Sequence, residues 1–173
     1  MLTVVTGGSG SGKSELAENI AVKSDGKKYY IAAMEPFGEE AMRRIQRHRK
    51  MRAEKGFETI EKYTDIDELI FTHNDIVLLE CMSNLCANEI FSGRTQKNAA
   101  ADKIISGIEI INNMVSQFII VTNEIFSDGI LYDKETMEYM KVLGEINRRV
   151  FEFADNVIES VYGIPYILKG NLI

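Results

Sequence analysis

Short apolar runs recur along the chain, and stretches with helical periodicity separate them. Residues 2–6, 75–80 and 118–122 have continuously apolar centres, as strands buried on both faces of a sheet do. Residues 13–22 and 134–154 instead place apolar side chains at helical spacing. Alternation of this kind predicts an α/β fold with a mostly parallel sheet and helices on both faces.

Further segments continue the alternation. We expect strands at residues 28–33 and, with a half-exposed alternating pattern, at residues 57–61. Further helices are expected in four segments: 39–54, 65–71, 83–91 and 98–115. Residues 156–162 and 165–168 should form a final antiparallel strand pair, because the connector between them is short. Without a repeat or linker in the pattern, residues 1–173 are expected to form a single nucleotide-binding domain.

The first strand leads into a glycine-rich loop, which runs directly into a helix. The loop fits the pattern G-x-x-x-x-G-K-[ST], which binds nucleotide phosphates in this strand–loop–helix context. Its glycines allow backbone N–H groups to turn inward around oxygen anions, and the helix N-terminus adds positive partial charge. We expect Lys13 to reach the β- and γ-phosphates and Ser14 to bind Mg²⁺. The predicted loop residues are Gly7, Gly8, Ser9, Gly10, Ser11, Gly12, Lys13 and Ser14.

Polar side chains follow two of the apolar strands. Glu80 ends one strand, and Asn123 and Glu124 follow another. Ligands of open α/β sheets bind at the carboxyl ends of the strands, so these side chains should share a crevice with the phosphate loop. Glu80 can hold Mg²⁺ through water; the alternative is that it caps the next helix, for which glutamate is poorly suited. For Asn123 and Glu124, a role in the site and an ordinary turn are both open.

Residues 43–52 form a strongly basic segment in an acidic chain. If the segment is helical, Arg44, His48 and Arg52 share one face, and phosphate is the natural counter-charge. Cationic neighbours favour a neutral imidazole, which can act as a nucleophile and carry a covalent intermediate. His48 is therefore a candidate to attack phosphorus while arginines stabilise the developing charge. The spacing equally permits a solvated basic face, and a nucleic-acid contact is a third interpretation.

Composition and charge narrow the functional class. The 173 residues carry a formal net charge of −6, which disfavours general attraction to nucleic acid or anionic lipid. No apolar run approaches the roughly 20 residues that span a bilayer, and no signal pattern opens the chain, so we expect a cytoplasmic protein without membrane insertion. Cys81 and Cys86 fit no usual zinc motif and are expected to be core or near-core thiols. His73, in a polar turn, is expected at the surface.

The sequence resembles one family from end to end, the bifunctional adenosylcobinamide kinase / adenosylcobinamide-phosphate guanylyltransferases. The phosphate loop alone is generic. The segments that carry the resemblance are VTGGSGSGKSELAE, YYIAAMEPFGEEAMRRIQRHRKMR, GFETIE, VLLECMSNLCANEIF, IIVTNEIFSDGI, LGEINRRVFEFADNVIESVYGIP and ILKG. The spacing of RIQRHRKMR, TIE, LLE and VTNE makes the match specific.

The resemblance implies a recombinase-like (RecA-like) fold and two reactions in one protein. ATP or GTP would phosphorylate the aminopropanol hydroxyl of adenosylcobinamide, and GMP from GTP would then pass to that phosphate, giving adenosylcobinamide-GDP. GMP would be carried by His48, Mg²⁺ would be the cofactor, and the protein would form a homo-oligomer such as a trimer. By the same resemblance, the further nucleotide contacts are Ala33, Met34, Glu35, Arg49, Lys50, Met51, Arg52, Glu61 and Glu80.

The chain departs from the family pattern at a few positions. Ala53 stands where proline is usual, Phe57 where tryptophan is usual, and residues 139–141 (Tyr-Met-Lys) where an arginine usually lies close to an aromatic residue. Such changes could affect the kinase step without touching His48. The alternatives are therefore a guanylyltransferase that has lost kinase activity, a nucleotide-binding module that contacts nucleic acid through the basic segment, and a non-catalytic assembly protein.

Overall fold

The computed structural model describes residues 1–36, 54–93, 96–127 and 129–171, together with Gly38, Met42 and Gln46. Within these residues the centre is a seven-stranded sheet in the order β3-β2-β4-β5-β1-β6-β7. Neighbouring strands pair in parallel except β6 and β7, which are antiparallel. The strands are β1 (Leu2–Thr6), β2 (Lys28–Ala32), β3 (Phe57–Glu61), β4 (Ile76–Leu79), β5 (Gln117–Val121), β6 (Asn156–Val161) and β7 (Ile164–Lys169).

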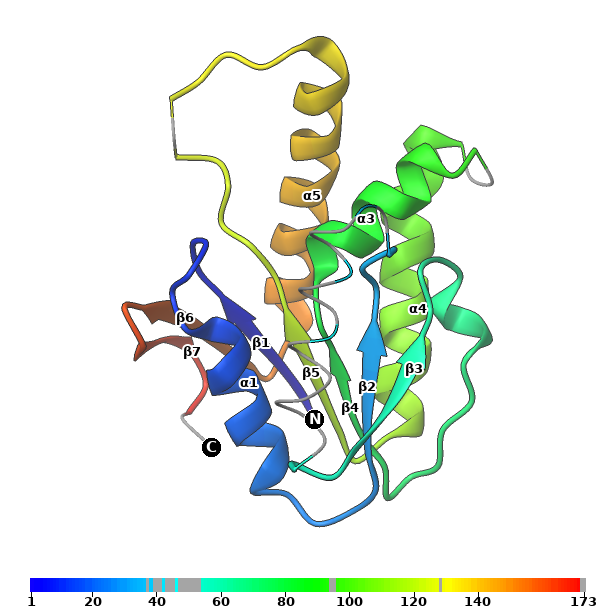
Figure 1. Cartoon of the computed structure of the whole chain (residues 1–173), viewed down its shortest axis with the longest axis vertical. Coiled ribbons are helices and arrows are strands. Elements are labelled where there is room, and N and C mark those ends of the chain that lie inside the picture. Colours follow the sequence, from blue (N-terminus) through cyan, green and yellow to red (C-terminus); the bar gives the residue numbers. More distant parts are fainter. Residues whose placement is uncertain are drawn as a thin grey trace.

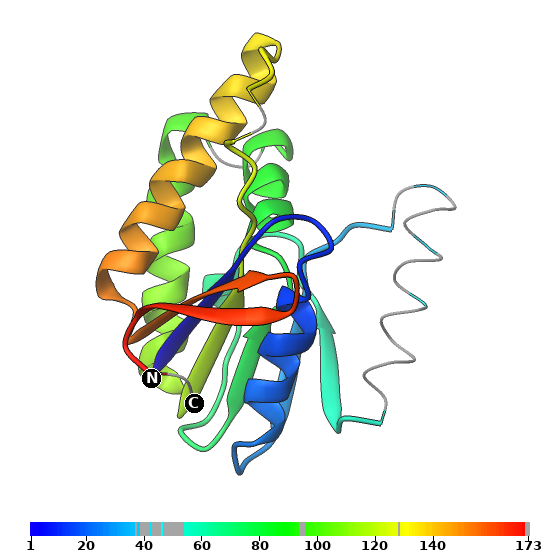
Figure 2. The same cartoon turned by 90° about the vertical axis from the view of Figure 1, so that its left-hand side faces the viewer.

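Helices cover both faces of this sheet (Figures 1 and 2). Helix α1 lies against one face, and helices α3, α4 and α5 gather on the other. The first half of α5 and the segment that precedes it extend beyond the carboxyl ends of the strands (Figure 1). The helices are α1 (Lys13–Val22), α3 (Met82–Phe91), α4 (Ala100–Met114) and α5 (Lys134–Phe153), with 3₁₀ turns η1 (Ile66–Glu68) and η2 (Lys97–Ala99).

Alternate residues of the central strands supply a separate core on each side of the sheet. In β5, Phe118 and Ile120 belong to the core under α3, α4 and α5, whereas Ile119 and Val121 belong to the core under α1. All four side chains are buried. A strand that is buried on both faces has no solvent-facing position, which explains its continuously apolar sequence.

The predicted fold class is confirmed, including the parallel sheet, the helices on both faces and the final antiparallel pair. The helix expected at residues 65–71 is wrong, because η1 is a single 3₁₀ turn. Asp65 adopts a left-handed backbone (φ 55°), and Leu69 is already extended, so no longer helix can form. The helix expected at residues 39–54 lies mostly outside the described residues. No helix of the described chain has both the length and the apolar content needed to cross a membrane.

Candidate functional site

The carboxyl ends of the parallel strands meet at one edge of the sheet. The phosphate loop leaves β1 there, and Glu80 and Glu124 follow β4 and β5. Backbone bonds fix these exits: the Glu124 N–H donates to the Gly7 carbonyl (3.2 Å), and the Glu80 N–H donates to the Ile31 carbonyl (3.0 Å). The structure therefore brings the predicted loop and both acidic residues to the same edge.

The phosphate loop depends on a glycine at its first position. Gly7 has φ 148°, and a Cβ built there would lie 2.6 Å from the Ser160 carbonyl oxygen. The Lys13 ammonium donates to the Gly8 carbonyl (2.9 Å), so this side chain folds back over the loop. The Ser11 Oγ is buried and has no hydrogen-bond partner among the described residues. The loop thus presents backbone amides, an ammonium group and an unsatisfied hydroxyl, a set that fits nucleotide phosphates.

The β6–β7 hairpin supports the phosphate loop from one side. The Ser11 carbonyl accepts hydrogen bonds from the Ser160 hydroxyl (2.7 Å) and from the Gly163 N–H (2.8 Å). Tyr162 and Gly163 form the hairpin turn with φ angles of 51° and 80°. A cavity of about 240 Å³ lies between the hairpin and the loop. Two elements that are distant in the sequence therefore form one rigid unit around the expected phosphates.

Glu80 follows β4 at the same edge of the sheet as the phosphate loop. The N-cap position of α3 is Cys81, whose side chain makes no capping hydrogen bond. Glu80 therefore does not occupy the cap position that was the alternative interpretation. Burial raises the pKa of the Cys81 thiol, and a backbone hydrogen bond at Asn84 opposes the rise. The negative charge of Glu80 raises this pKa further, and the positive charge of Lys13 lowers it. Glu80 and Lys13 both lie at the carboxyl edge of the sheet, where they follow β4 and β1 respectively.

The residues after β5 make turn contacts within the same crevice. The Asn123 amide donates to the Ser83 hydroxyl (2.8 Å). The Glu124 carboxylate accepts from the Phe126 N–H (2.9 Å) and from the Ser127 hydroxyl (2.8 Å). These contacts support the interpretation as a turn, and a role of the two side chains in the site stays a prediction.

A separate cavity of about 410 Å³ brings Glu35 and Glu61 together, along with Tyr63. These residues come from the ends of β2 and β3, which are neighbours in the sheet. The Tyr63 hydroxyl donates to the Glu61 carboxylate (3.2 Å). The Asn88 amide of α3 donates to the backbone carbonyls of Ala33 (2.8 Å) and Tyr63 (3.0 Å), which ties the two strand exits together. Ala33 is buried and Met34 is half-buried beside this cavity's strand exits.

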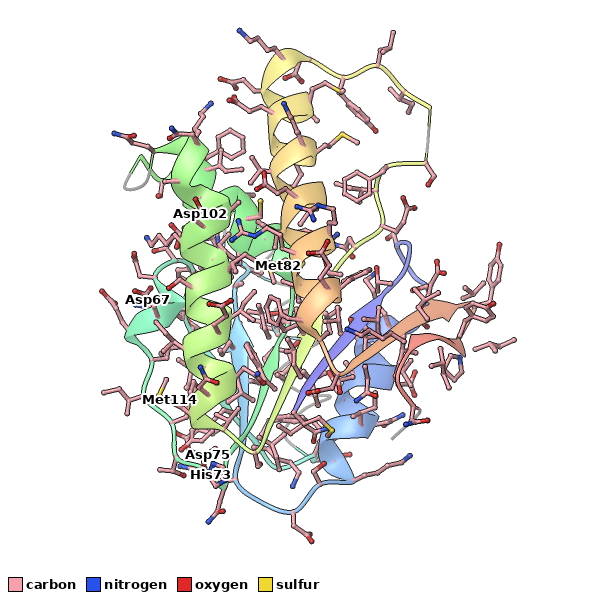
Figure 3. All side chains as sticks on the ribbon, turned by 180° about the vertical axis from the view of Figure 1, so that it is seen from behind. Asp67, His73, Asp75, Met82, Asp102 and Met114 are labelled. Carbon is pink, nitrogen blue, oxygen red and sulfur yellow. The ribbon has the colours of Figure 1, made fainter. Side chains whose placement is uncertain are left out.

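The candidate nucleophile and its neighbours lie outside the described residues: His48, Arg49, Lys50, Met51 and Arg52. The other histidine, His73, is exposed, as expected. It lies beside Asp75 at the opposite end of the sheet from the phosphate loop (Figure 3). Cys81 is half-buried and Cys86 is buried, and both are free thiols, which confirms the prediction for the cysteines.

Part of the edge was not found from the sequence. A cavity of about 430 Å³ runs from Ser9 to Tyr132, Tyr139 and Met140. From the sequence alone, residues 139–141 were only a departure from the family pattern and not part of a predicted cavity. Their position was a usable signal, since they lie in the first half of the helix that follows a polar strand end. Burial raises the pKa of Tyr139 to about 12, and a hydrogen bond with the Ser83 side chain opposes that rise. The Tyr139 hydroxyl also donates to the Ser83 backbone carbonyl (3.3 Å).

Within the described residues, no three His, Cys, Asp or Glu side chains are grouped closely enough to hold a metal ion by themselves. Magnesium bound with a nucleotide needs one or two protein ligands, because phosphates and water complete its shell. Ser14, in the first turn of α1, and Glu80 fit that requirement.

Comparisons with known proteins show which proteins this chain resembles. A sequence model described as cobinamide kinase / cobinamide phosphate guanyltransferase matches residues 3–168. The bifunctional adenosylcobalamin biosynthesis protein CobU of Escherichia coli (strain K12) is 28% identical, over 98% of this chain and 100% of its own length. The bifunctional adenosylcobalamin biosynthesis protein CobP of Pseudomonas aeruginosa is 25% identical, over 98% of each chain. The crystal structure of the KaiC-like protein PH0186 from Pyrococcus horikoshii OT3 overlaps 91% of this chain and 71% of its own, with a TM-score of 0.48 and 13% identity, a likeness too distant to bear on function.

Proposed function

Since this chain belongs to the cobinamide kinase / cobinamide phosphate guanyltransferase family, we propose that it is a bifunctional enzyme of cobalamin biosynthesis. Its two activities are those of an adenosylcobinamide kinase and an adenosylcobinamide-phosphate guanylyltransferase. The family match over residues 3–168 is the observation that carries this proposal. Residues 1–173 act as one catalytic unit, and GTP, ATP, adenosylcobinamide and adenosylcobinamide phosphate are its substrates. We place the enzyme in the cytoplasm as a homo-oligomer, a trimer by family resemblance, with no nucleic-acid partner.

The kinase step uses the phosphate loop. Backbone N–H groups of the loop, the α1 N-terminus and the Lys13 ammonium hold the triphosphate. Ser14 and Glu80 would hold Mg²⁺, which when bound neutralises charge on the transferring phosphate. The aminopropanol hydroxyl oxygen bonds to the γ-phosphorus, the bond to the bridging β–γ oxygen breaks, the nucleoside diphosphate leaves, and the hydroxyl proton passes to solvent. The protein's contribution is alignment of the two reactants and stabilisation of charge.

The guanylyltransferase step proceeds through His48. A ring nitrogen of His48 bonds to the α-phosphorus of GTP, and pyrophosphate leaves. The phosphate oxygen of adenosylcobinamide phosphate then attacks the same phosphorus, which releases the imidazole and forms adenosylcobinamide-GDP. The arginines Arg49 and Arg52 stabilise the charge that develops.

The cavity that Glu35 and Glu61 line suits the guanosine part of GTP. Guanine carries N–H donors on one edge and ribose carries hydroxyl donors, and ionised carboxylates are acceptors. The Asn88 bonds hold the two strand exits that position these carboxylates. We therefore assign guanosine recognition to this cavity, separate from the loop that holds triphosphate in the kinase step.

One observation favours a second candidate, a guanylyltransferase with diminished kinase activity. Met140 lines the cavity beside Ser9, near the position where the family resemblance places an arginine. An apolar side chain there offers no contact to a transferring phosphate. Transfer of a γ-label from ATP or GTP to adenosylcobinamide measures this directly, and its absence alongside GMP transfer would select the second candidate.

The test of the guanylyltransferase mechanism uses GTP labelled separately at the α- and γ-phosphates. We expect an acid-labile, base-stable protein adduct from the α-label, no adduct from the γ-label, and loss of the adduct in His48→Ala. His73→Ala is the matched control, since His73 lies exposed at the far end of the sheet and should leave labelling unchanged. Product formation without α-label on the protein would refute the covalent mechanism.

A further inference from the structure

An apolar hollow lies between residues 124–127 and 129–132 and the first half of α5. One part, of about 430 Å³, reaches from Ser9 of the phosphate loop to Tyr132 and Met140. A second part, of about 660 Å³, is lined by Phe126, Met137 and Met140 together with three charged side chains, Lys134, Glu138 and Lys141. Met140 borders both parts, so they form one continuous surface, which we name the α5 hollow. It lies where α5 extends beyond the strand ends (Figure 1).

The walls of the α5 hollow are held in place by the fold. Glu124 fixes the start of one wall through its bonds to Phe126 and Ser127. The Phe126 ring lies over Gly144, where an added Cβ would be in ordinary van der Waals contact with it at 3.6 Å. On the other wall, Asp133 caps α5 by accepting from the Thr136 N–H (2.9 Å). The hollow is therefore preformed by the chain, as binding sites for small molecules usually are.

Large apolar side chains in the lining of the hollow and next to it in the sequence are exposed. Leu131 is 95% exposed, Ile130 is 59% exposed and Met137 is 46% exposed. Exposed apolar side chains that gather on one surface mark a binding site on a soluble protein. Methionine and aromatic side chains adapt to large, irregular apolar ligands. The Thr136 and Ser127 hydroxyls lie in the same lining. Each donates its proton to a neighbouring carboxylate and can still accept a hydrogen bond from an amide N–H of a ligand.

We propose that the α5 hollow binds the corrin ring of the acceptor, a large amphipathic macrocycle with methyl and amide substituents. The inference rests on the proposed function, which requires an acceptor next to the phosphate loop. Ring methyl groups lie against Phe126, Met137 and Met140, ring amides meet the hydroxyls, and the aminopropanol arm reaches past Ser9 towards the γ-phosphate. The shared boundary with Ser9 is the reason to assign the hollow to the acceptor rather than to a second copy of the chain.

The test measures binding of cobinamide, which absorbs visible light, by equilibrium dialysis against the full chain. Met137→Glu places a charge in the hollow, and Phe126→Ala removes an apolar wall. Both residues are more than two-fifths exposed, so the core is not disturbed. We expect each variant to weaken cobinamide binding by about tenfold or more, with unchanged α-labelling by GTP. Ile110→Glu, on the exposed face of α4 and 41% exposed, is the matched control and should bind as the wild type does.

The remaining outcomes separate the inference from the proposed function. Wild-type affinity for cobinamide in both variants would overturn the inference and leave the proposed function standing. A change of subunit number in Met137→Glu, measured by light scattering, would overturn it in favour of a subunit interface, whether or not cobinamide binding also changed. A wild-type protein that neither binds cobinamide nor accepts the α-label would refute the proposed function and the inference with it.

Discussion

Replacing Gly7 by alanine should damage the phosphate loop through two separate effects. The φ angle of 148° lies in a region that residues with a Cβ rarely adopt, and holding alanine there costs about 1–3 kcal/mol. The new Cβ would also lie 2.6 Å from the Ser160 carbonyl and 2.7 Å from the Ser11 Oγ, so the backbone of the hairpin or the loop must move. Overpacking of this kind costs about another 1–3 kcal/mol. We therefore expect Gly7→Ala to lower the free energy of unfolding by about 2–6 kcal/mol.

The assay is urea unfolding of the nucleotide-free protein, followed by the same measurement with saturating GTP. Gly8→Ala is the matched control, because a Cβ at Gly8 has no described atom within 4 Å. Gly8→Ala should unfold within about 1 kcal/mol of the wild type, whereas Gly7→Ala should unfold at lower urea and gain less from GTP. Equal urea midpoints for Gly7→Ala and the wild type would show that the close approach of the loop to the hairpin imposes no constraint. The loop and the hairpin would then not form one rigid unit.

Three further predictions concern contacts near the site. Ser160→Ala removes the 2.7 Å hydrogen bond to the Ser11 carbonyl. In urea unfolding it should lower the free energy of unfolding by about 0.5–1.5 kcal/mol, and it should raise the GTP concentration needed for half-maximal α-labelling. If both values stayed unchanged, Ser160 would not support the loop. Tyr162→Gly should raise the free energy of unfolding by up to about 1 kcal/mol, because glycine adopts the left-handed φ of 51° without strain. The tyrosine is 94% exposed, so little burial is lost. A lower urea midpoint for the variant would contradict this. A hydrogen bond from Lys103 lowers the pKa of the Asp65 carboxyl in the folded protein. The stability that this pair contributes is complete above the unfolded pKa of about 3.9, and it is lost as pH falls through the lowered folded pKa. The stability difference between the wild type and Lys103→Met should therefore be largest at neutral pH and shrink below pH ~4, and a difference that stays constant with pH would contradict the pairing.

Local sequence patterns predicted most strands and helices because a strand that is buried on both faces must be apolar at nearly every position. The run Phe118–Val121 is apolar at every position, since alternate side chains enter opposite cores. The ligand edge was predictable for a related reason: parallel strands end together, so polar residues after apolar runs collect at one place. Glu80 and the phosphate loop follow this rule.

The contacts between distant segments could not be predicted in the same way. Ser160 and Ser11 are 149 positions apart, and no periodicity reports which hairpin packs on which loop. Glu35 and Glu61 share a cavity because β2 and β3 are neighbours, and strand order is not written in either strand's own sequence. The failed helix at residues 65–71 has a similar origin, since the Asp65 N–H donates to the Glu89 carboxylate of α3 (2.7 Å) and thereby sets a turn.

The grip of the β6–β7 hairpin on the phosphate loop has a consequence for biosynthesis. The phosphate loop is synthesised before the β6–β7 hairpin, because Ser11 precedes Ser160 by 149 positions. The sheet can therefore begin to assemble while the hairpin is still missing. Gly163 and Ser160 reach Ser11 only after translation has passed both of them. A nascent polypeptide should consequently remain unable to capture triphosphate until the hairpin has been synthesised, which delays any stabilisation of the fold by the ligand until then.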